Sequence, residues 1–335
     1  YVLREYTPDV QIVLDRNENY VPIESGFGGP AGTRHAYFDT ITFATNTDAA
    51  SRTAGMIAGD YSYGAISPEM GPYAEKIGLK SVLKDNLWTH AIFFNLSQEF
   101  NAHSIVQNVN FRKAVRAALN CEEIMMSVAD GDLSQCRVNS SPMDPTNTAY
   151  YNTILDDTEW NIANQELAKQ YLAQSGYNGE PVIWLTHANG AFYKAAVIGI
   201  EALRAVGINA ELKAVDNGSH SAMRGDPSTG YDIGAWEVQQ AQYSPLQSNN
   251  LIVGKAGGAH CWVNEDRDAL LEIMRNTKIG SAESVQAYKD LCTLWSEEVP
   301  WIIFGTKMTL TYTQPDVVLD MQGLITYYWN SYFVK

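Results

Sequence analysis

The stretch 181–215, PVIWLTHANGAFYKAAVIGIEALRAVGINAELKAV, contains two strand-like runs on either side of one helical pattern. The run Pro181–Thr186 is rich in β-branched and aromatic residues, which is typical of a strand. Apolar residues then recur at helical spacing over Ala191–Val206, and Gly207 ends that pattern. Ile208–Val215 has a strand pattern again. Strand, helix and strand in this order predict a βαβ unit with parallel strands and a right-handed crossover.

An alternation of helices and strands continues on both sides of this unit. Helical periodicity predicts helices over Val109–Leu119, Glu159–Ser175, Glu265–Thr277 and Ala282–Glu298, and residue composition predicts a strand over Tyr231–Glu237. In the first of these helices the basic residues Arg112, Lys113 and Arg116 lie opposite the apolar face. The middle of the chain therefore has the pattern of an α/β domain.

The two ends of the chain are richer in strands than the middle. Strands are expected at Val10–Arg16, Tyr37–Thr45, Leu79–Leu83, Thr89–Leu96 and Trp301–Tyr312. One helix is expected over Ala49–Ala58, with Thr47 or Asp48 as its N-cap and Gly59 at its end. This order predicts a discontinuous domain, in which the first and last segments form one lobe and the middle forms the other.

Length and charge restrict the class of protein. The chain has 335 residues, which suggests about two domains. Its formal net charge is −15, only 18% of residues are charged and 45% are hydrophobic. These values exclude a disordered chain, and they argue against nucleic acid or anionic lipid as a partner, because both require basic surface. No apolar run approaches the roughly 18 residues needed to span a bilayer.

Sequence motifs give little sign of catalysis. The six His include no closely spaced pair and no H-E-x-x-H motif, and the four Cys include no C-x-x-C. The chain also lacks a phosphate-binding loop and a G-x-S-x-G elbow. We therefore expect no catalytic residues, no metal site and no cofactor.

Polar and aromatic residues gather instead where two predicted strands end. Thr186-His187-Ala188-Asn189 follows one strand, and Trp236 to Gln239 ends the strand Tyr231–Glu237. Ligands of open α/β sheets bind beyond the carboxyl ends of the strands. The candidate ligand-binding residues are Trp236, Gln239, Glu237, Gln242, His187, Asn189 and Asn95. The alternative is that Trp236 is a core residue and the amides form an ordinary polar loop.

Several motifs along the chain resemble those of one known family. The string NVNFRKAVRAALN at 108–120 resembles a helix motif of the family 5 extracellular solute-binding proteins, which are the peptide, nickel and opine receptors of ABC importers. Further similar segments follow the family's order: Tyr1–Arg16, Phe38–Phe43, Ala168–Tyr177, Tyr231–Trp236, Trp262–Leu271 and Glu297–Pro300. Each segment alone is degenerate, but their order over the whole chain is specific.

The resemblance implies an α/β, two-lobe periplasmic-binding-protein-like fold of type II, cluster C. The chain matches the C-terminal two-thirds of the family, so lobe I is expected to be incomplete. Residues 1–95 would form the rear part of lobe I, 96–303 lobe II, and 304–335 the return to lobe I. The hinge strands are expected near Phe93–Ser97 and Trp301–Thr306. The chain opens at Tyr1 without a Met, so we expect a fragment from which the signal segment is absent.

The resemblance also implies a function. Family members bind a solute between two closing lobes and deliver it to a membrane permease, without catalysis. The expected partners are a small-molecule or peptide ligand and ABC permease subunits, the expected state is a monomer, and the expected location is periplasmic or lipid-anchored extracellular. In the peptide-binding branch an Asp three positions after the matching Trp holds the ligand's amino group. Here that position is the neutral Gln239, which favours a neutral or multiply hydroxylated ligand, such as a sugar or glycoside, over an ordinary peptide, although a modified peptide remains open. The expected solute is thus small and polar, either oligopeptide-like or sugar-like or opine-like.

Two other functions and one disulfide remain open at this point. A hydrolase or transferase would need Glu237, His187 or Ser244 as its reactive group. A ligand-sensing domain would use the same fold to signal to another protein. Because the family is exported, the resemblance favours disulfides, and Cys261–Cys292 is the first candidate pair.

Overall fold

The computed structural model describes residues 1–22, 24, 32–84, 88–248, 262–322 and 325–334. The chain divides into unit 1, formed by Tyr1–Asn86 with Met308–Lys335, and unit 2, formed by Leu87–Lys307. The expected boundaries at 95/96 and 303/304 differ from these. The reason is that strands β6 (Trp88–Phe94) and β11 (Trp301–Lys307) pair with each other inside the sheet of unit 2.

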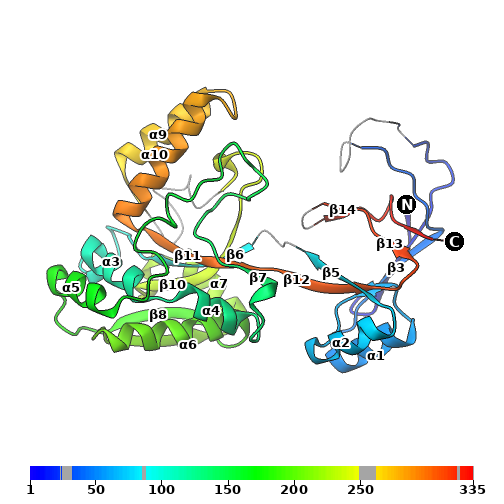
Figure 1. Ribbon diagram of the computed structural model, residues 1–335, viewed down its shortest axis with the longest axis horizontal. Coiled ribbons are helices and arrows are strands. Elements are labelled where there is room, and N and C mark those ends of the chain that lie inside the picture. Colours follow the sequence, from blue (N-terminus) through cyan, green and yellow to red (C-terminus); the bar gives the residue numbers. More distant parts are fainter. Residues whose placement is uncertain (23, 25–31, 85–87, 249–261, 323–324, 335) are drawn as a thin grey trace. The chain divides into compact units, whose positions relative to one another are not determined.

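Unit 2 contains a six-stranded mixed sheet with the order β7-β11-β6-β10-β8-β9 (Figure 1). The remaining strands are β7 (Cys136–Arg137), β8 (Val182–His187), β9 (Ala210–Val215) and β10 (Ile233–Gln239). β8 pairs in parallel with both β9 and β10, whereas β6 is antiparallel to β10 and β11. The predicted βαβ unit is therefore confirmed, with α6 as its crossover helix.

Seven helices are described in unit 2. They are α3 (Val109–Ala118), α4 (Cys121–Val128), α5 (Gln165–Ser175), α6 (Gly190–Ala205), α7 (Asn217–Gly225), α9 (Glu265–Asn276) and α10 (Ala282–Glu298). Helix α5 begins six residues later than the expected Glu159. Asn161 and Ala163 have positive φ angles of 54° and 46°, which a helix cannot contain, and the side chain of Asn164 then caps the helix by accepting from Leu167 N.

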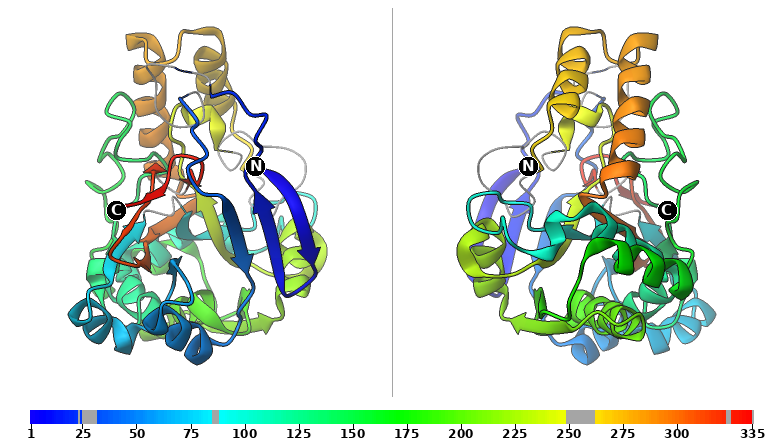
Figure 2. Two further views of the ribbon diagram at one scale, coloured as in Figure 1. Left: turned by 90° about the vertical axis from the view of Figure 1, so that its right-hand side faces the viewer. Right: turned by 90° about the vertical axis from the view of Figure 1, so that its left-hand side faces the viewer.

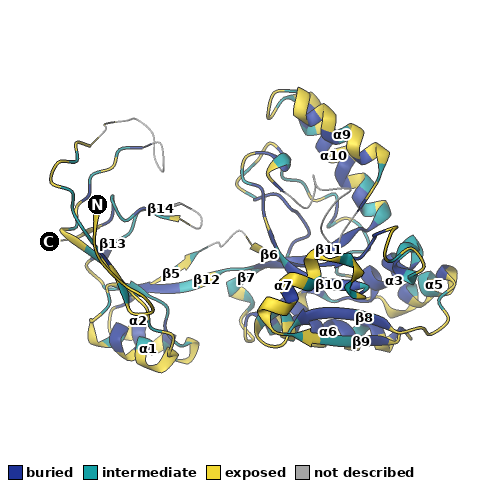
Figure 3. Cartoon of the chain, turned by 180° about the vertical axis from the view of Figure 1, so that it is seen from behind, coloured by how far each residue is buried: buried dark blue, intermediate teal, exposed yellow. Residues whose placement is uncertain are grey.

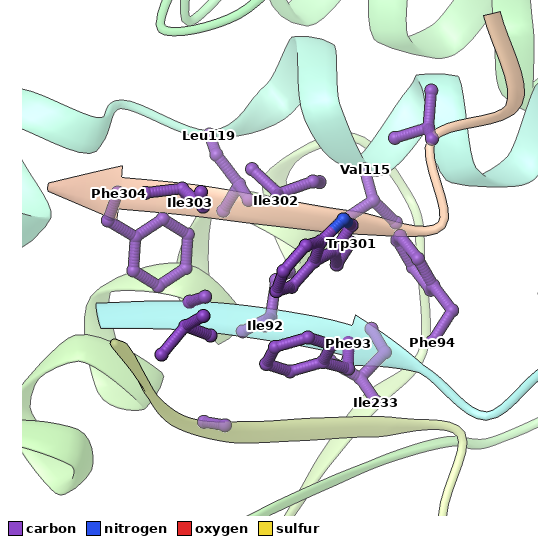
Figure 4. Packing of buried hydrophobic residues seen from close by; sticks show 14 of the residues in the cluster. Ile92, Phe93, Phe94, Val115, Leu119, Ile233, Trp301, Ile302, Ile303 and Phe304 are labelled. Atoms are coloured by element: carbon purple, nitrogen blue, oxygen red, sulfur yellow. The ribbon is translucent and has the colours of Figure 1, made fainter. Parts of the chain in front are cut away.

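The core of unit 2 is centred on β6 and β11 (Figure 4). Ile92, Phe93 and Phe94 of β6 are fully buried, and they pack with Trp301 to Phe304 of β11 and with Val115 and Leu119 on and just after α3. Side chains on both faces of these strands are buried because helices cover the sheet, which explains their continuous apolar runs. The segments expected near the hinge thus lie in the core of unit 2.

Two basic residues of α3 are buried rather than solvated. Arg112 donates through Nε to Glu298 O at 2.8 Å and through Nη1 to Val106 O at 2.8 Å. Arg116 donates to Ser296 O at 2.6 Å and forms an ion pair with Glu159. Both guanidinium groups therefore hold α3 against the last turn of α10.

The described residues of unit 1 form small sheets and two α-helices. A three-stranded antiparallel sheet comprises β1 (Val2–Thr7), β2 (Gln11–Asp15) and β3 (Thr40–Ala44). A second three-stranded sheet has the order β4 (Tyr63–Gly64), β12 (Thr309–Thr313) and β5 (Lys80–Lys84). In two short two-stranded sheets, β13 (Val317–Val318) pairs with β16 (Tyr332–Phe333), and β14 (Met321–Gln322) pairs with β15 (Ile325–Thr326). The helices are α1 (Ala49–Ala58) and α2 (Gly71–Lys76).

Helix α1 has the expected bounds, with Asp48 as N-cap and Gly59 in the left-handed region. The expected strand Trp301–Tyr312 is split at Met308 into β11 and β12, because its two halves belong to different units. No described helix is both long and apolar enough to cross a membrane.

The β1–β3 sheet, whose strands lie side by side in Figure 2, carries exposed apolar residues, and much of these strands is coloured as exposed in Figure 3. The register places Tyr6, Ile12 and Phe43 side by side, and Leu3 lies beside Leu14. Leu3 and Tyr6 are 64% and 62% exposed, although apolar sheet faces are usually covered. Within unit 1, Phe43 of this face packs edge-on against Tyr328, with ring centroids 5.2 Å apart, while Leu3 and Tyr6 stay exposed.

Candidate ligand-binding site

The candidate site lies where β8 and β10 end in unit 2. The parallel register Ile233↔Trp184 and Gly234↔Leu185 brings the carboxyl ends of both strands to one edge of the sheet. Helix α6 begins directly after β8, and α7 begins directly after β9. The sequence-predicted residues His187 and Trp236 are thereby brought to the same edge.

Trp236 belongs to the core at this edge. Its side chain is 5% exposed and stacks on Phe93, with ring centroids 4.0 Å apart and planes 5° apart. Phe93 in turn lies 4.6 Å from the ring of Trp301, which stacks on Trp295 at 4.4 Å. The burial of Trp236 therefore agrees with the alternative interpretation, in which Trp236 is a core residue.

A basic residue that sequence reasoning missed lies over Trp236. The guanidinium carbon of Arg224, at the end of α7, is 5.8 Å from the centre of the Trp236 ring, a cation–π arrangement. Arg224 is exposed, and the described residues give its guanidinium no carboxylate partner. An exposed guanidinium offers N–H donors in a planar fork, a shape that matches a ligand carboxylate.

Two histidines complete this side of the site. His187, the last residue of β8, stacks on His220 of α7 with ring centroids 3.9 Å apart. Burial and the nearby Arg224 lower the pKa of His187. Burial, His187 and Arg224 together lower the pKa of His220 to about 4. Both rings are therefore neutral near pH 7, and each can donate or accept a hydrogen bond.

Glu237 occupies the other face of the sheet. Side chains alternate along a strand, so Glu237 points away from Trp236. It is paired in register with His90 of β6, whose Nε2 lies 3.8 Å from Glu237 Oε1. Burial, helped by Lys307, lowers the pKa of His90 to about 4, and burial raises the pKa of Glu237. Glu237 is thus not placed to assist a group held at Trp236.

The predicted amides are spread over different surroundings. Gln239 is exposed at the end of β10, Gln242 is half-buried in the following loop, and Asn189 is exposed at the N-cap of α6. Asn95 is fully buried, and its side-chain nitrogen donates to Pro227 O at 3.0 Å and to Tyr231 O at 2.9 Å. Both amide hydrogens of Asn95 are therefore used inside the unit, which leaves neither for a ligand.

Other reactive groups have structural roles or stand alone. Ser244 is the N-cap of a short turn, where its Oγ accepts from Leu246 N. Within the described ranges no three His, Cys, Asp or Glu side chains are grouped so that they could hold a metal ion. Cys121, Cys136 and Cys292 are free thiols, and Cys261, the proposed partner of Cys292, lies outside the described residues.

Comparison with known proteins adds a family and a fold. The model of the bacterial extracellular solute-binding proteins, family 5 Middle, matches residues 1–259. The oligopeptide-binding protein AppA of Bacillus subtilis (strain 168) is 22% identical over 291 residues, which cover 81% of this chain and 49% of AppA. The chain thus spans about half the length of this curated relative.

Three solved structures have the same fold. The ABC transporter substrate-binding protein CtaP from Listeria monocytogenes superposes with a TM-score of 0.82 at 16% identity, over 99% of this chain and 66% of CtaP. Bacillus subtilis AppA in complex with a nonapeptide gives a TM-score of 0.71 at 19% identity, over 100% of this chain and 66% of AppA. AgaA in complex with agropinic acid, from A. tumefacien R10, gives 0.69 at 18% identity, over 99% and 66%.

These superpositions confirm the expected α/β periplasmic-binding-protein fold, and the coverage of 66% agrees with an incomplete lobe. The family model extends over more than three-quarters of the chain. The chain belongs to the bacterial extracellular solute-binding proteins of family 5.

Proposed function

We propose that this chain is part of the substrate-binding receptor of an ABC importer, which captures a small polar solute and delivers it to a membrane permease. The family is extracellular by its description, and CtaP is described as an ABC transporter substrate-binding protein. Among the similar proteins, AppA of Bacillus subtilis is named an oligopeptide-binding protein and its structure contains a nonapeptide, while the structure of AgaA contains agropinic acid. A receptor of this kind would work at the outer side of the membrane, either periplasmic or lipid-anchored, as a monomer.

The observation that carries the proposal is the exposed guanidinium of Arg224, whose Cζ lies 5.8 Å from the centre of the Trp236 ring, near the stacked rings of His187 and His220. This set offers charge-assisted donors and neutral imidazoles within one edge of a rigid sheet. It favours a solute that carries a carboxylate, such as an oligopeptide or an opine, over a neutral sugar. A hydrolase is less well supported, because Glu237 points to the opposite face and Ser244 serves as a helix cap.

The proposal can be tested with the protein purified from its own host. Native mass spectrometry followed by denaturation should release a carboxylate-bearing small molecule. An Arg224→Gln variant should then bind that molecule at least about tenfold more weakly by calorimetry, since a charge-assisted hydrogen bond is lost. Arg275→Gln is the matched control, because Arg275 is equally basic but lies on α9, paired with Glu272. Chemical conversion of the solute, or equal affinity of both variants, would contradict the proposal.

A further inference from the structure

The chain contains three Asn-Gly pairs, at 178–179, 189–190 and 217–218. In such a pair the backbone nitrogen of Gly can attack the side-chain carbonyl carbon of Asn, because Gly has no Cβ to obstruct the approach. Ammonia leaves and a cyclic succinimide forms. Water then opens the ring to aspartate or isoaspartate, so the net change is addition of water and loss of ammonia. Structure decides which pair can react, since both the amide and the Gly nitrogen must be free to move.

Two of the pairs are held by hydrogen bonds. The side-chain nitrogen of Asn178 donates to Gly176 O at 2.9 Å, and its backbone nitrogen donates to Glu180 Oε2 at 3.0 Å. In the third pair the attacking nitrogen is itself engaged, because Gly218 N donates to Asp216 Oδ1 at 2.9 Å. That pair also lies within the first turn of α7, whose backbone is fixed.

The pair Asn189-Gly190 has none of these restraints. Asn189 is exposed and stands at the N-cap of α6, yet its side chain makes no capping hydrogen bond. Its backbone is extended, with φ −155° and ψ 179°. Gly190 N is one of the first N–H groups of the helix, which have no partner within the helix, and it makes no hydrogen bond with a described residue. Gly190 has a φ of 74°, which favours glycine over other residues and so maintains the reactive pair.

We propose that Asn189 is a site of spontaneous deamidation, and that the reaction adds a negative charge beside the candidate ligand-binding site. A carboxylate at this position lies at the N-terminus of α6, where the helix dipole favours it, so the folded protein tolerates the product. The new charge lies two residues from His187 and favours its protonated form. If the proposed function holds, it also opposes binding of a carboxylate solute at Arg224.

The test is peptide mapping by mass spectrometry after incubation of the folded protein in mildly alkaline buffer. Asn189 should gain about 1 Da and accumulate isoaspartate at least several-fold faster than Asn178 or Asn217. A parallel incubation in denaturant should bring the three rates together, because the hydrogen bonds that protect the other two pairs are then lost. Equal rates in the folded protein, a reversed order, or an unchanged preference for Asn189 in denaturant would overturn the proposal.

A variant separates this reaction from ligand binding. Asn189→Asp supplies the charge of the product without the reaction, and Asn189→Gln retains an amide while removing the fast site. In the receptor proposed above, Asn189→Asp should weaken binding of a carboxylate solute several-fold more than Asn189→Gln does, since only the first variant adds a negative charge. The mapping result does not depend on any ligand, so failure of the proposed function would leave the deamidation rates as predicted.

Discussion

Replacing Gly234 by Ala should move Trp236 out of its stack. An ideal Cβ at Gly234 would lie 2.5 Å from Trp236 Cζ3 and 3.1 Å from Tyr231 Cε2, both much closer than van der Waals contact. Trp236 cannot simply retreat, because its ring lies flat against Phe93 with centroids 4.0 Å apart. The substitution therefore either strains the strand or separates the two rings.

The expected change in the free energy of unfolding combines two destabilising contributions and one stabilising contribution. Overpacking of a filled core costs about 1–3 kcal/mol, and loss of the aromatic pair costs about 0.5–1.5 kcal/mol. Removing a glycine from a strand interior returns about 0.5–1 kcal/mol. We expect a net loss of about 2 kcal/mol in the free energy of unfolding of unit 2, because the steric contribution at Gly234 outweighs the gain in backbone entropy.

The assay is urea unfolding followed by tryptophan fluorescence, with near-ultraviolet circular dichroism of the native state. Because the chain has two units, the transition reported by the Trp cluster is analysed separately from the rest. Gly225→Ala is the matched control, since Gly225 is the last residue of α7 and a Cβ there meets no atom within 4 Å. An unchanged midpoint and an unchanged near-ultraviolet spectrum for Gly234→Ala would refute the described packing of Trp236.

Three further predictions concern other parts of the chain. The pKa of His90 is about 4 in the folded state, below the ordinary value of 6.5. The contribution of neutral His90 to stability is therefore complete above pH 6.5 and is lost as the pH falls toward 4. His90→Asn should flatten that part of a curve of stability against pH. Arg112→Met should cost about 3–5 kcal/mol in urea unfolding, because it leaves buried carbonyl oxygens without their charged donor. Tyr6→Lys with Ile12→Lys should change the free energy of unfolding in urea by no more than about 0.5 kcal/mol per residue, since Tyr6 and Ile12 are 62% and 38% exposed.

Local patterns predicted the elements whose ends are fixed by local chemistry. Helix α1 has the predicted bounds because Asp48 caps it by accepting from Ser51 N and Gly59 ends it in the left-handed region. Helix α10 likewise begins after Ser281, whose side chain accepts from Ser284 N. The start of α5 was wrong because the same helical periodicity continued through residues whose backbone is turned by tertiary contacts.

Burial of charge could not be predicted in this way. Arg112 and Arg116 lie opposite the apolar residues of α3, a position that usually faces solvent. Their acceptors are carbonyl oxygens at the end of α10, 180 or more residues further along the chain. Periodicity within one helix holds no information about such distant partners. The same limit applies to the strand that divides at Met308, where one continuous β pattern serves two units.

The candidate site shows the same division between local and tertiary information. The strand-end rule brought His187 and Trp236 together, whereas Glu237, predicted for the same site, lies on the opposite face because side chains alternate along β10. Arg224 was missed because nothing in its own segment distinguishes it from any other exposed arginine near a helix end. Only the packing of α7 beside His187 sets its guanidinium over the Trp236 ring.

This placement bears on how an acidic chain can hold an acidic solute. A net charge of −15 repels anions at long range, but salt screens charges separated by more than about 8 Å. Within that distance the solute of the proposed receptor would meet Arg224, for which the described residues supply no competing carboxylate, while Glu237 lies on the other face of the sheet. The proposed specificity therefore depends on the arrangement of a few side chains at one sheet edge rather than on the overall charge. For the same reason one new carboxylate at Asn189, at that edge, should matter more than several on the outer surface.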